Sequence, residues 1–196
     1  MKLFSIKNTV IILSLLLNIL MGKDKTGLEG SSAPYWGLKT SKGKWEYLDN
    51  YTAPVKQTIN GERKVVVMSF FASWCAPCMR EINVLQKLEE HYKDQGKPVQ
   101  FFLVNLTEYF RNRSGAPNQH AKAPNALQKL KDRGLNKIAI LEDSNGKTAR
   151  RYGVSDKLPR LFVIDKFETV HLDATGLCDT CLDQELVPLI DKLADE

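Results

Sequence analysis

Two cysteines, Cys75 and Cys78, directly follow the apolar run of residues 64–71, "KVVVMSFF". A short apolar run rich in β-branched residues predicts a strand that is buried on both faces. Apolar residues then recur at helical spacing over residues 77–93, and a second apolar run covers residues 98–106. A strand, a helix and a second buried strand predict a right-handed parallel crossover. The two cysteines therefore lie where a buried strand turns into a helix.

This position favours thiolate chemistry at Cys75. Pro77 is well tolerated in the first turn of a helix, where the amides have no carbonyl partner. The same free amides and the helix dipole favour negative charge, so a cysteine there loses its proton more readily. Our hypothesis is that Cys75 attacks a disulfide and that Cys78, one turn later, resolves the mixed disulfide. The alternatives are a structural bridge and half of a zinc site, but the strand-to-helix context favours a redox pair.

Charge and cysteine count narrow the class of protein. The 196 residues include 28 Lys and Arg against 23 Asp and Glu, a net charge of +5 without a dense basic block. We therefore expect no nucleic-acid partner. All four cysteines fall into two C-x-x-C pairs, Cys75/Cys78 and Cys178/Cys181, with none left over. Such pairing is typical of redox chemistry, a disulfide or a metal site.

The first 26 residues have the order of an export signal. Two lysines precede the apolar run Thr9–Met21, and a polar segment follows. The run is short for a membrane span, which needs about 20 apolar residues, although residues 4–22 together could anchor the chain. We expect an extracytoplasmic protein, with residues 1–26 as signal peptide or membrane anchor, residues 27–32 as a linker and residues 33–196 as one domain.

The rest of the domain alternates strands and helices. Apolar alternation around Gly43 predicts a hairpin over residues 33–51, and residues 107–125 are polar and predict a long exposed loop. Pro188 should kink or delay the last helix. The other predicted elements are short helices over residues 126–133 and 147–154, strands over residues 137–141, 160–165 and 168–176, the last two antiparallel, and a final helix over residues 182–194.

The segment "F-x-A-S-W-C-A-P-C-x-x-E", residues 70–81, resembles the thioredoxin superfamily, and in particular its extracytoplasmic TlpA/ResA-like branch. Ala33-Pro34 with Gly43 and Leu48 is similar to the N-terminal hairpin of that branch. Residues 158–165, "LPRLFVID", are similar to the cis-proline strand of the superfamily. The resemblance implies an α/β thioredoxin fold over residues 33–196, with a central mixed β-sheet flanked by helices and an N-terminal β-hairpin extension.

The resemblance also implies how the site is supported. The Leu158–Pro159 bond is expected to be cis and to lie opposite the cysteine pair, with the backbone of Leu158 pairing with an extended substrate and the proline ring excluding a metal. Trp74 and Pro77 frame the cysteines. We expect neither a metal nor a cofactor at this site.

Three positions bear on proton transfer. Six residues before the first cysteine, where thioredoxins often carry a buried acid, this chain has Ser69. We therefore expect no buried carboxylate base at the site, and Asn105 on the neighbouring strand is the candidate replacement for a charged partner. Glu81 is common in the TlpA-like pattern, and a solvated surface acid accounts for it equally well.

Three interpretations of Cys178 and Cys181 stay open. They form a local disulfide in an oxidising compartment, a second redox pair that exchanges electrons with the first, or part of a metal site. Basic residues between positions 111 and 133 form either a solvated face or a docking surface for an acidic partner or anionic lipid. The three histidines, at positions 91, 120 and 171, are assigned to the surface or to strands.

We expect a thiol–disulfide oxidoreductase that reduces disulfides in partner proteins. The resemblance implies apocytochrome c or copper-site cysteines as substrates and a membrane electron donor. The alternative class is a thiol-based copper chaperone that uses both C-x-x-C pairs. A peroxidase of the same fold is disfavoured because a second cysteine at this spacing is not typical of one.

Overall fold

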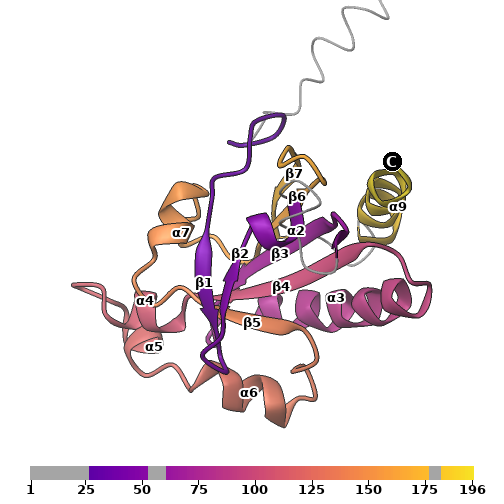
Figure 1. Cartoon of the computed structure of the whole chain (residues 1–196). Helices are drawn as coiled ribbons and strands as arrows, with labels where there is room; N and C mark the ends of the chain where they lie inside the picture. The colour runs from indigo at the N-terminus through magenta and orange to yellow at the C-terminus, as the bar shows by residue number, and fades with distance from the viewer. Residues whose placement is uncertain (1–26, 53–60, 177–181) are drawn as a thin grey trace, which may run out of the picture.

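The computed structural model describes residues 27–52, 61–176 and 182–196. Within these ranges the chain forms one seven-stranded sheet in the order β2-β1-β5-β4-β3-β6-β7, with helices on both faces (Figure 1). The strands are β1 (Gly37–Thr40), β2 (Trp45–Tyr47), β3 (Val65–Phe71), β4 (Val99–Asn105), β5 (Ala139–Glu142), β6 (Arg160–Ile164) and β7 (Val170–Thr175). The helices are α2 (Asp49–Thr52), α3 (Ala76–Asp94), α4 (Thr107–Arg111), α5 (Asn118–Ala121), α6 (Ala126–Asp132), α7 (Lys147–Arg151), the π-turn η3 (Leu182–Leu186) and α9 (Val187–Asp195).

The predicted crossover is confirmed, and it places the strand ends. Strands β3, β4 and β5 are mutually parallel, so Phe71, Asn105 and Glu142 lie in register at one edge of the sheet. Strand β6 pairs antiparallel with β3, and β7 pairs antiparallel with β6 and ends the sheet on that side. The loops after β3, β4 and β5 therefore gather at a single edge, as expected for the carboxyl ends of parallel strands.

Every residue of β3 is buried because both faces of the sheet are covered. Val67 and Phe71 point into a core with α3, α6 and α9, whereas Met68 and Phe70 point into a second core with the hairpin, α2, α4 and α7. Alternate residues of one strand thus serve two hydrophobic layers, which explains the continuous apolar run in the sequence.

The N-terminal part of the domain extends the sheet at both edges. Strands β1 and β2 form the predicted hairpin, and β1 pairs with β5. Residues 27–32, expected as a linker, form turns against β7: the Gly30 N–H donates to the Val170 carbonyl at 2.8 Å, and the Val170 N–H donates to the Ser31 carbonyl at 3.0 Å. These residues cover the outer edge of β7.

The structure tests the predictions for residues 107–125 and for the start of the last helix. Residues 107–125, expected as one exposed loop, contain the short helices α4 and α5, so that prediction was wrong. The delayed start of the last helix is confirmed: α9 begins at Val187 after η3, with Pro188 in its first turn. Proline fits there because it has no N–H to pair.

Three ranges, residues 1–26, 53–60 and 177–181, lie outside the described part of the chain. The expected signal or anchor, and the pair Cys178/Cys181, fall on these ranges. Among the described helices, none has the length and apolar character that crossing a membrane requires.

We predict that Ile190→Ala in α9 lowers the free energy of unfolding by about 2–5 kcal/mol, because a fully buried side chain would leave a cavity. Urea denaturation of the oxidised protein measures the change. Lys192→Ala on the exposed side of the same helix is the control and should change stability by less than about 0.5 kcal/mol. Equal effects of the two substitutions would mean that α9 is not held by its apolar face.

Candidate active site

Cys75 and Cys78 are joined by a disulfide at the start of α3, with their Cα atoms 5.3 Å apart. Cys75 is the N-cap residue of this 19-residue helix, and Pro77 lies in its first turn. The Cys78 N–H donates to the Cys75 sulfur at 3.1 Å. In the reduced protein this amide and the helix N-terminus are placed to stabilise negative charge on the first sulfur.

Burial around the pair is uneven. The side chain of Cys75 is 3% exposed and Cys78 is fully buried, whereas Ala76 and Pro77 between them are exposed. Of the two cysteines, Cys75 is therefore the slightly more accessible one, and the attacking and resolving roles stay a prediction.

Trp74 is held by an aromatic cluster from the segment after β4. Its ring stacks on His120 with centroids 4.0 Å apart, and Phe110 packs edge-on at 5.6 Å. His120 is buried, so its assignment to the surface was wrong; His91 and His171 are exposed as predicted. The helices α4 and α5 thus form one wall beside the disulfide.

A hollow of 240 Å³ lies next to this wall. His120 lines it, together with Arg113 and Asp156. Arg113 and Asp156 form an ion pair that links the wall to the segment leading into Leu158. The wall and the proline segment are therefore connected across the hollow.

Polar contacts of Ser73 hold the loop that carries Trp74 in place. The Ser73 hydroxyl donates to the Pro124 carbonyl at 2.6 Å, and the Ser73 N–H donates to the Thr107 hydroxyl at 2.9 Å. Lys129 donates to the Ser73 carbonyl. These contacts tie the active-site loop to the segment that also supplies Phe110 and His120.

Asn105 belongs to this support. Its side-chain oxygen accepts from the Thr107 hydroxyl at 2.7 Å, and its amide donates to Glu142 at 2.8 Å. It therefore positions the loops at the edge of the sheet through Thr107.

The Leu158–Pro159 bond is cis, as the resemblance implied. The Pro159 carbonyl accepts from the Gly176 N–H at 3.0 Å, so the proline is joined to the end of β7. Leu158 packs against the hydrophobic core that contains both cysteines.

Glu81 corrects the prediction that the site has no buried carboxylate. Its side chain is 2% exposed, and one oxygen accepts a hydrogen bond from the Ser69 hydroxyl at 2.6 Å. Its other oxygen has no hydrogen-bond partner in the described part of the chain. The acid comes from the helix, one turn after Cys78, whereas the prediction of no buried carboxylate rested on the serine at strand position 69.

A signal for this burial was present in the sequence. Cys78, Glu81, Ile82 and Leu85 follow one another at i, i+3, i+4 and i+7, which is the spacing of the inward face of a helix. An acid at such a position is directed toward the core, so of the two accounts left open for Glu81 the solvated surface acid was wrong. No comparable pattern marks His120, whose contacts depend on how the segment after β4 folds back.

Burial raises the pKa of Glu81 to about 7, and the hydrogen bond from Ser69 only partly offsets this effect. Desolvation disfavours the charged carboxylate, while a donor stabilises it. Near neutral pH this carboxyl group is therefore divided between its protonated and ionised forms, as a group that accepts and releases protons requires.

The comparisons with known proteins agree with this geometry. A model of the AhpC/TSA family matches residues 30–172. The thiol-disulfide oxidoreductase ResA of Geobacillus thermodenitrificans is 29% identical over 147 residues, which are 75% of this chain and 69% of that protein. The thioredoxin-like protein YneN of Bacillus subtilis is 32% identical over 74 residues, 37% of this chain and 38% of that protein.

Solved structures give the same class. A structure described as the thiol:disulfide interchange protein DsbE from Chlorobium tepidum has a TM-score of 0.63 at 26% identity, covering 86% of this chain and 99% of its own. StoA from Bacillus subtilis, at 19% identity, has a TM-score of 0.52 over 74% of this chain and 90% of its own, and it supports the fold alone.

The fold and the cysteine pair define the class, a thioredoxin-like thiol–disulfide oxidoreductase. Within that class, the chain belongs to the AhpC/TSA family.

Across the described residues, no group of three or more histidine, cysteine or acidic side chains is arranged to hold a metal ion. Cys178 and Cys181 are not among these residues, so the three interpretations of the second pair stay hypotheses.

We predict that Glu81→Gln stabilises the protein increasingly as pH rises. The folded pKa of about 7 lies above the ordinary value of 4.5, so below both values Glu81 is protonated in either state. Above both, an ionised carboxylate must stay buried. The free energy of unfolding of the variant minus that of the wild type should therefore grow by about 3 kcal/mol between about pH 4 and pH 8.

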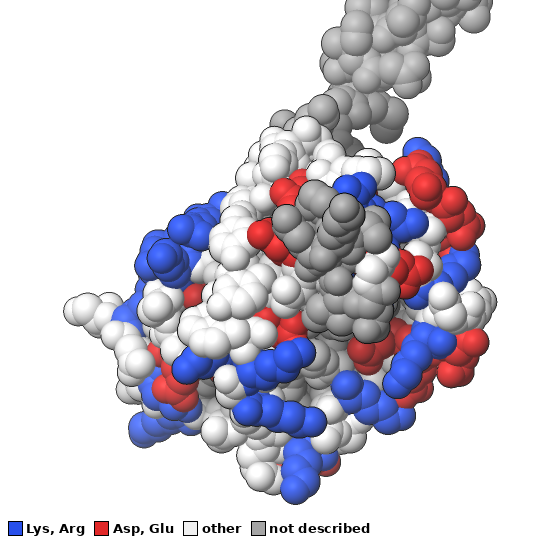
Figure 2. Space-filling model, viewed as in Figure 1, with Lys and Arg blue, Asp and Glu red and all other residues white. Residues whose placement is uncertain are grey.

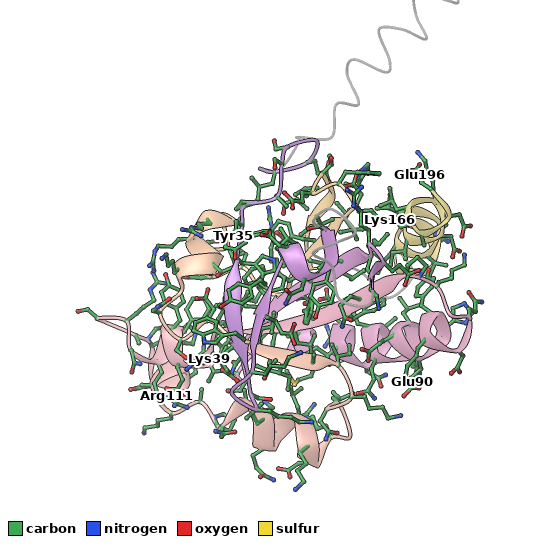
Figure 3. The ribbon with its side chains drawn as sticks, in the orientation of Figure 1. Tyr35, Lys39, Glu90, Arg111, Lys166 and Glu196 are labelled. Carbon is green, nitrogen blue, oxygen red and sulfur yellow. A yellow bond between two sulfur atoms is a disulfide. The ribbon has the colours of Figure 1, made fainter. Side chains whose placement is uncertain are left out.

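Urea denaturation at a series of pH values measures this difference. Glu90→Gln is the control, because the Glu90 side chain, on the same helix beside Lys137, is 45% exposed (Figure 3). A difference between Glu81→Gln and wild type that does not vary with pH would show that Glu81 is ionised normally in the folded protein.

Proposed function

We propose that the protein reduces disulfides in partner proteins outside the cytoplasm through the dithiol form of Cys75 and Cys78. The observation that carries this proposal is the pair itself: two cysteines at the N-terminus of a long helix, followed one turn later by a buried carboxyl group. Leu158, which precedes the cis-proline, and Trp74 both pack against the core that contains the two cysteines.

The reaction proceeds by two thiol–disulfide exchanges. The Cys75 thiolate attacks one sulfur of the partner's disulfide; a mixed disulfide forms, and the partner's other sulfur leaves as a thiolate and takes a proton. Cys78 then loses its proton and attacks the Cys75 sulfur. The bond between Cys75 and the partner breaks, so the partner leaves as a dithiol and the protein retains the disulfide, two electrons having been transferred.

Glu81 is suited to accept the proton that Cys78 releases. It lies on the face of α3 that also carries Cys78, and one of its oxygens is not engaged in a hydrogen bond in the described structure. Its pKa of about 7 leaves a large ionised fraction at neutral pH. Resolution should therefore become faster as pH rises through about 7.

The TlpA/ResA-like resemblance supports a proposal for the direction, the substrates and the location. We propose cysteine pairs of apocytochrome c or of copper sites as substrates, electrons from a membrane donor, and export directed by residues 1–26. A reduction potential of about −270 mV for Cys75/Cys78 would support a reductase. A potential of about −120 mV would indicate an oxidant that makes disulfides.

The copper-chaperone alternative requires both C-x-x-C pairs to be reduced and close together. Metal analysis of the full chain, purified under reducing conditions without added copper, separates the two functions. Stoichiometric tightly bound copper would favour the chaperone, and a metal-free protein that reduces a protein disulfide would favour the oxidoreductase.

We predict that Cys78→Ser traps a mixed disulfide with a partner protein through Cys75, because the resolving thiol is absent. Non-reducing electrophoresis followed by peptide mass mapping identifies the linked cysteine. Cys75→Ser is the matched variant and should trap little or nothing. Trapping through Cys78 in that variant, with none in Cys78→Ser, would reverse the two roles.

We predict that Glu81→Gln slows resolution by roughly a hundredfold at neutral pH and removes the rise in rate near pH 7. Rapid-mixing measurement of partner release gives the rate. Glu89→Gln is the matched control, since burial also raises the pKa of Glu89 to about 7 but it lies two turns further along α3. A wild-type pH profile retained in Glu81→Gln would assign the proton transfer to another group.

A further inference from the structure

Exposed aromatic side chains gather on the β1–β2 hairpin. Four large apolar side chains are more than a third exposed in the described structure, and three of them belong to the hairpin or directly precede it. These are Tyr35 at 49%, Trp45 at 50% and Tyr47 at 38%, whereas Phe167 at 65% lies in the turn between β6 and β7. The hairpin is thus the place where the described surface concentrates aromatic area.

Two of the rings form a preorganised shelf. Trp45 and Tyr47 flank the buried Glu46 on β2, so both point outward, and their rings are parallel within 13° at 6.0 Å. Tyr47 lies opposite Gly37 in the hairpin register. A Cβ atom at Gly37 would be 2.6 Å from the Tyr47 ring, so the ring rests directly on bare backbone.

A groove runs between this shelf and α7. Its volume is 690 Å³, with Tyr35, Trp45 and Tyr47 on one side and Lys147 and Arg151 on the other. A neighbouring hollow of 380 Å³ shares Lys39 and Glu142 with it and reaches Asn105 and Asn125. The combined groove therefore follows the edge of the sheet toward the segment that supports Ser73.

The exposed charges of the groove are positive. Lys39, Lys147 and Arg151 are exposed, and the Lys39 ammonium lies 5.3 Å from the centre of the Trp45 ring. Three acids line the groove and the neighbouring hollow. Asp143 is buried and accepts from the Ala149 N–H, Glu142 accepts from the Asn105 amide, and Glu108 is paired with Arg111. Figure 2 shows basic side chains over the hairpin and over α7, with uncharged surface between them.

We propose that this groove docks an extended, acidic segment of a partner protein. Apolar side chains of the segment would lie on Trp45 and Tyr47, and its carboxylates would pair with Lys39, Lys147 and Arg151. Exposed Trp, Tyr and Arg are the residue types that dominate binding energy at protein interfaces.

One feature favours a chain over a flat lipid surface. The site is concave, with residues of the hairpin on one side and residues of α7 on the other. Tyr35, two residues before β1, and Lys39, near the end of β1, mark the length of the hairpin side of the groove (Figure 3). Docking there would raise the effective concentration of a partner's disulfide at Cys75.

Fluorescence polarisation of a labelled peptide of repeated Glu-Leu-Ser units, with the oxidised full chain, tests the proposal. We expect binding that weakens with salt, and little binding of the matching Lys-Leu-Ser peptide. Trp45→Ser and Lys147→Glu should each weaken the affinity about tenfold. Phe167→Ser and Lys192→Glu are the matched controls, one exposed aromatic residue and one exposed lysine away from the groove, and should leave affinity unchanged.

Equal binding of the two peptides, or equal losses in the groove and control variants, would overturn the proposal. So would the absence of peptide binding together with Trp45-dependent binding to phosphatidylglycerol vesicles, which would assign the surface to anionic lipid. Because the oxidised protein is used, the result does not depend on disulfide reduction. Loss of disulfide reduction and loss of peptide binding are therefore measured separately, and one can fail without the other.

Discussion

The parallel pairing of β4 with β3 on one side and with β5 on the other is the constraint on which the rest of the structure depends. It brings three strand ends to one edge of the sheet. Phe71 leads to the cysteines, Asn105 leads to the wall formed by α4 and α5, and Glu142 leads to the groove beside α7. Hydrogen bonds through Ser73 and Thr107 then fix these loops relative to one another. The cysteine pair and the groove proposed for docking thus lie at one edge of the sheet.

The elements that the sequence predicts well are those with strong periodicity. The β3 run, the amphipathic α3 and the apolar β4 are each bounded by clear signals, and the motif between β3 and α3 indicates the cysteine pair from its residue types and spacing alone. The short helices α4 and α5 have too few residues to show a period. The stacking of His120 on Trp74 joins residues far apart in sequence, so only the folded chain reveals it.

Glu81 shows how a family expectation can hide a physical signal. Thioredoxins often place an acid on the strand, and the serine found there suggested a site without one. The helix instead supplies the carboxyl group, and Ser69 becomes its hydrogen-bond donor. The buried carboxyl group of this site therefore comes from α3 and not from β3.

The two outer strands of the sheet differ in how they are protected. Residues 30–33 pair with the segment around Val170, so the chain shields β7 with its own backbone, whereas β2 ends the sheet at the other side. The unpaired N–H and C=O groups of an unshielded edge strand can pair with a strand of another molecule. A chain shortened to begin after Ala33 would expose the edge of β7 as well as that of β2. Such a chain would aggregate through strand-to-strand pairing, even with the cysteine pair and its surroundings intact.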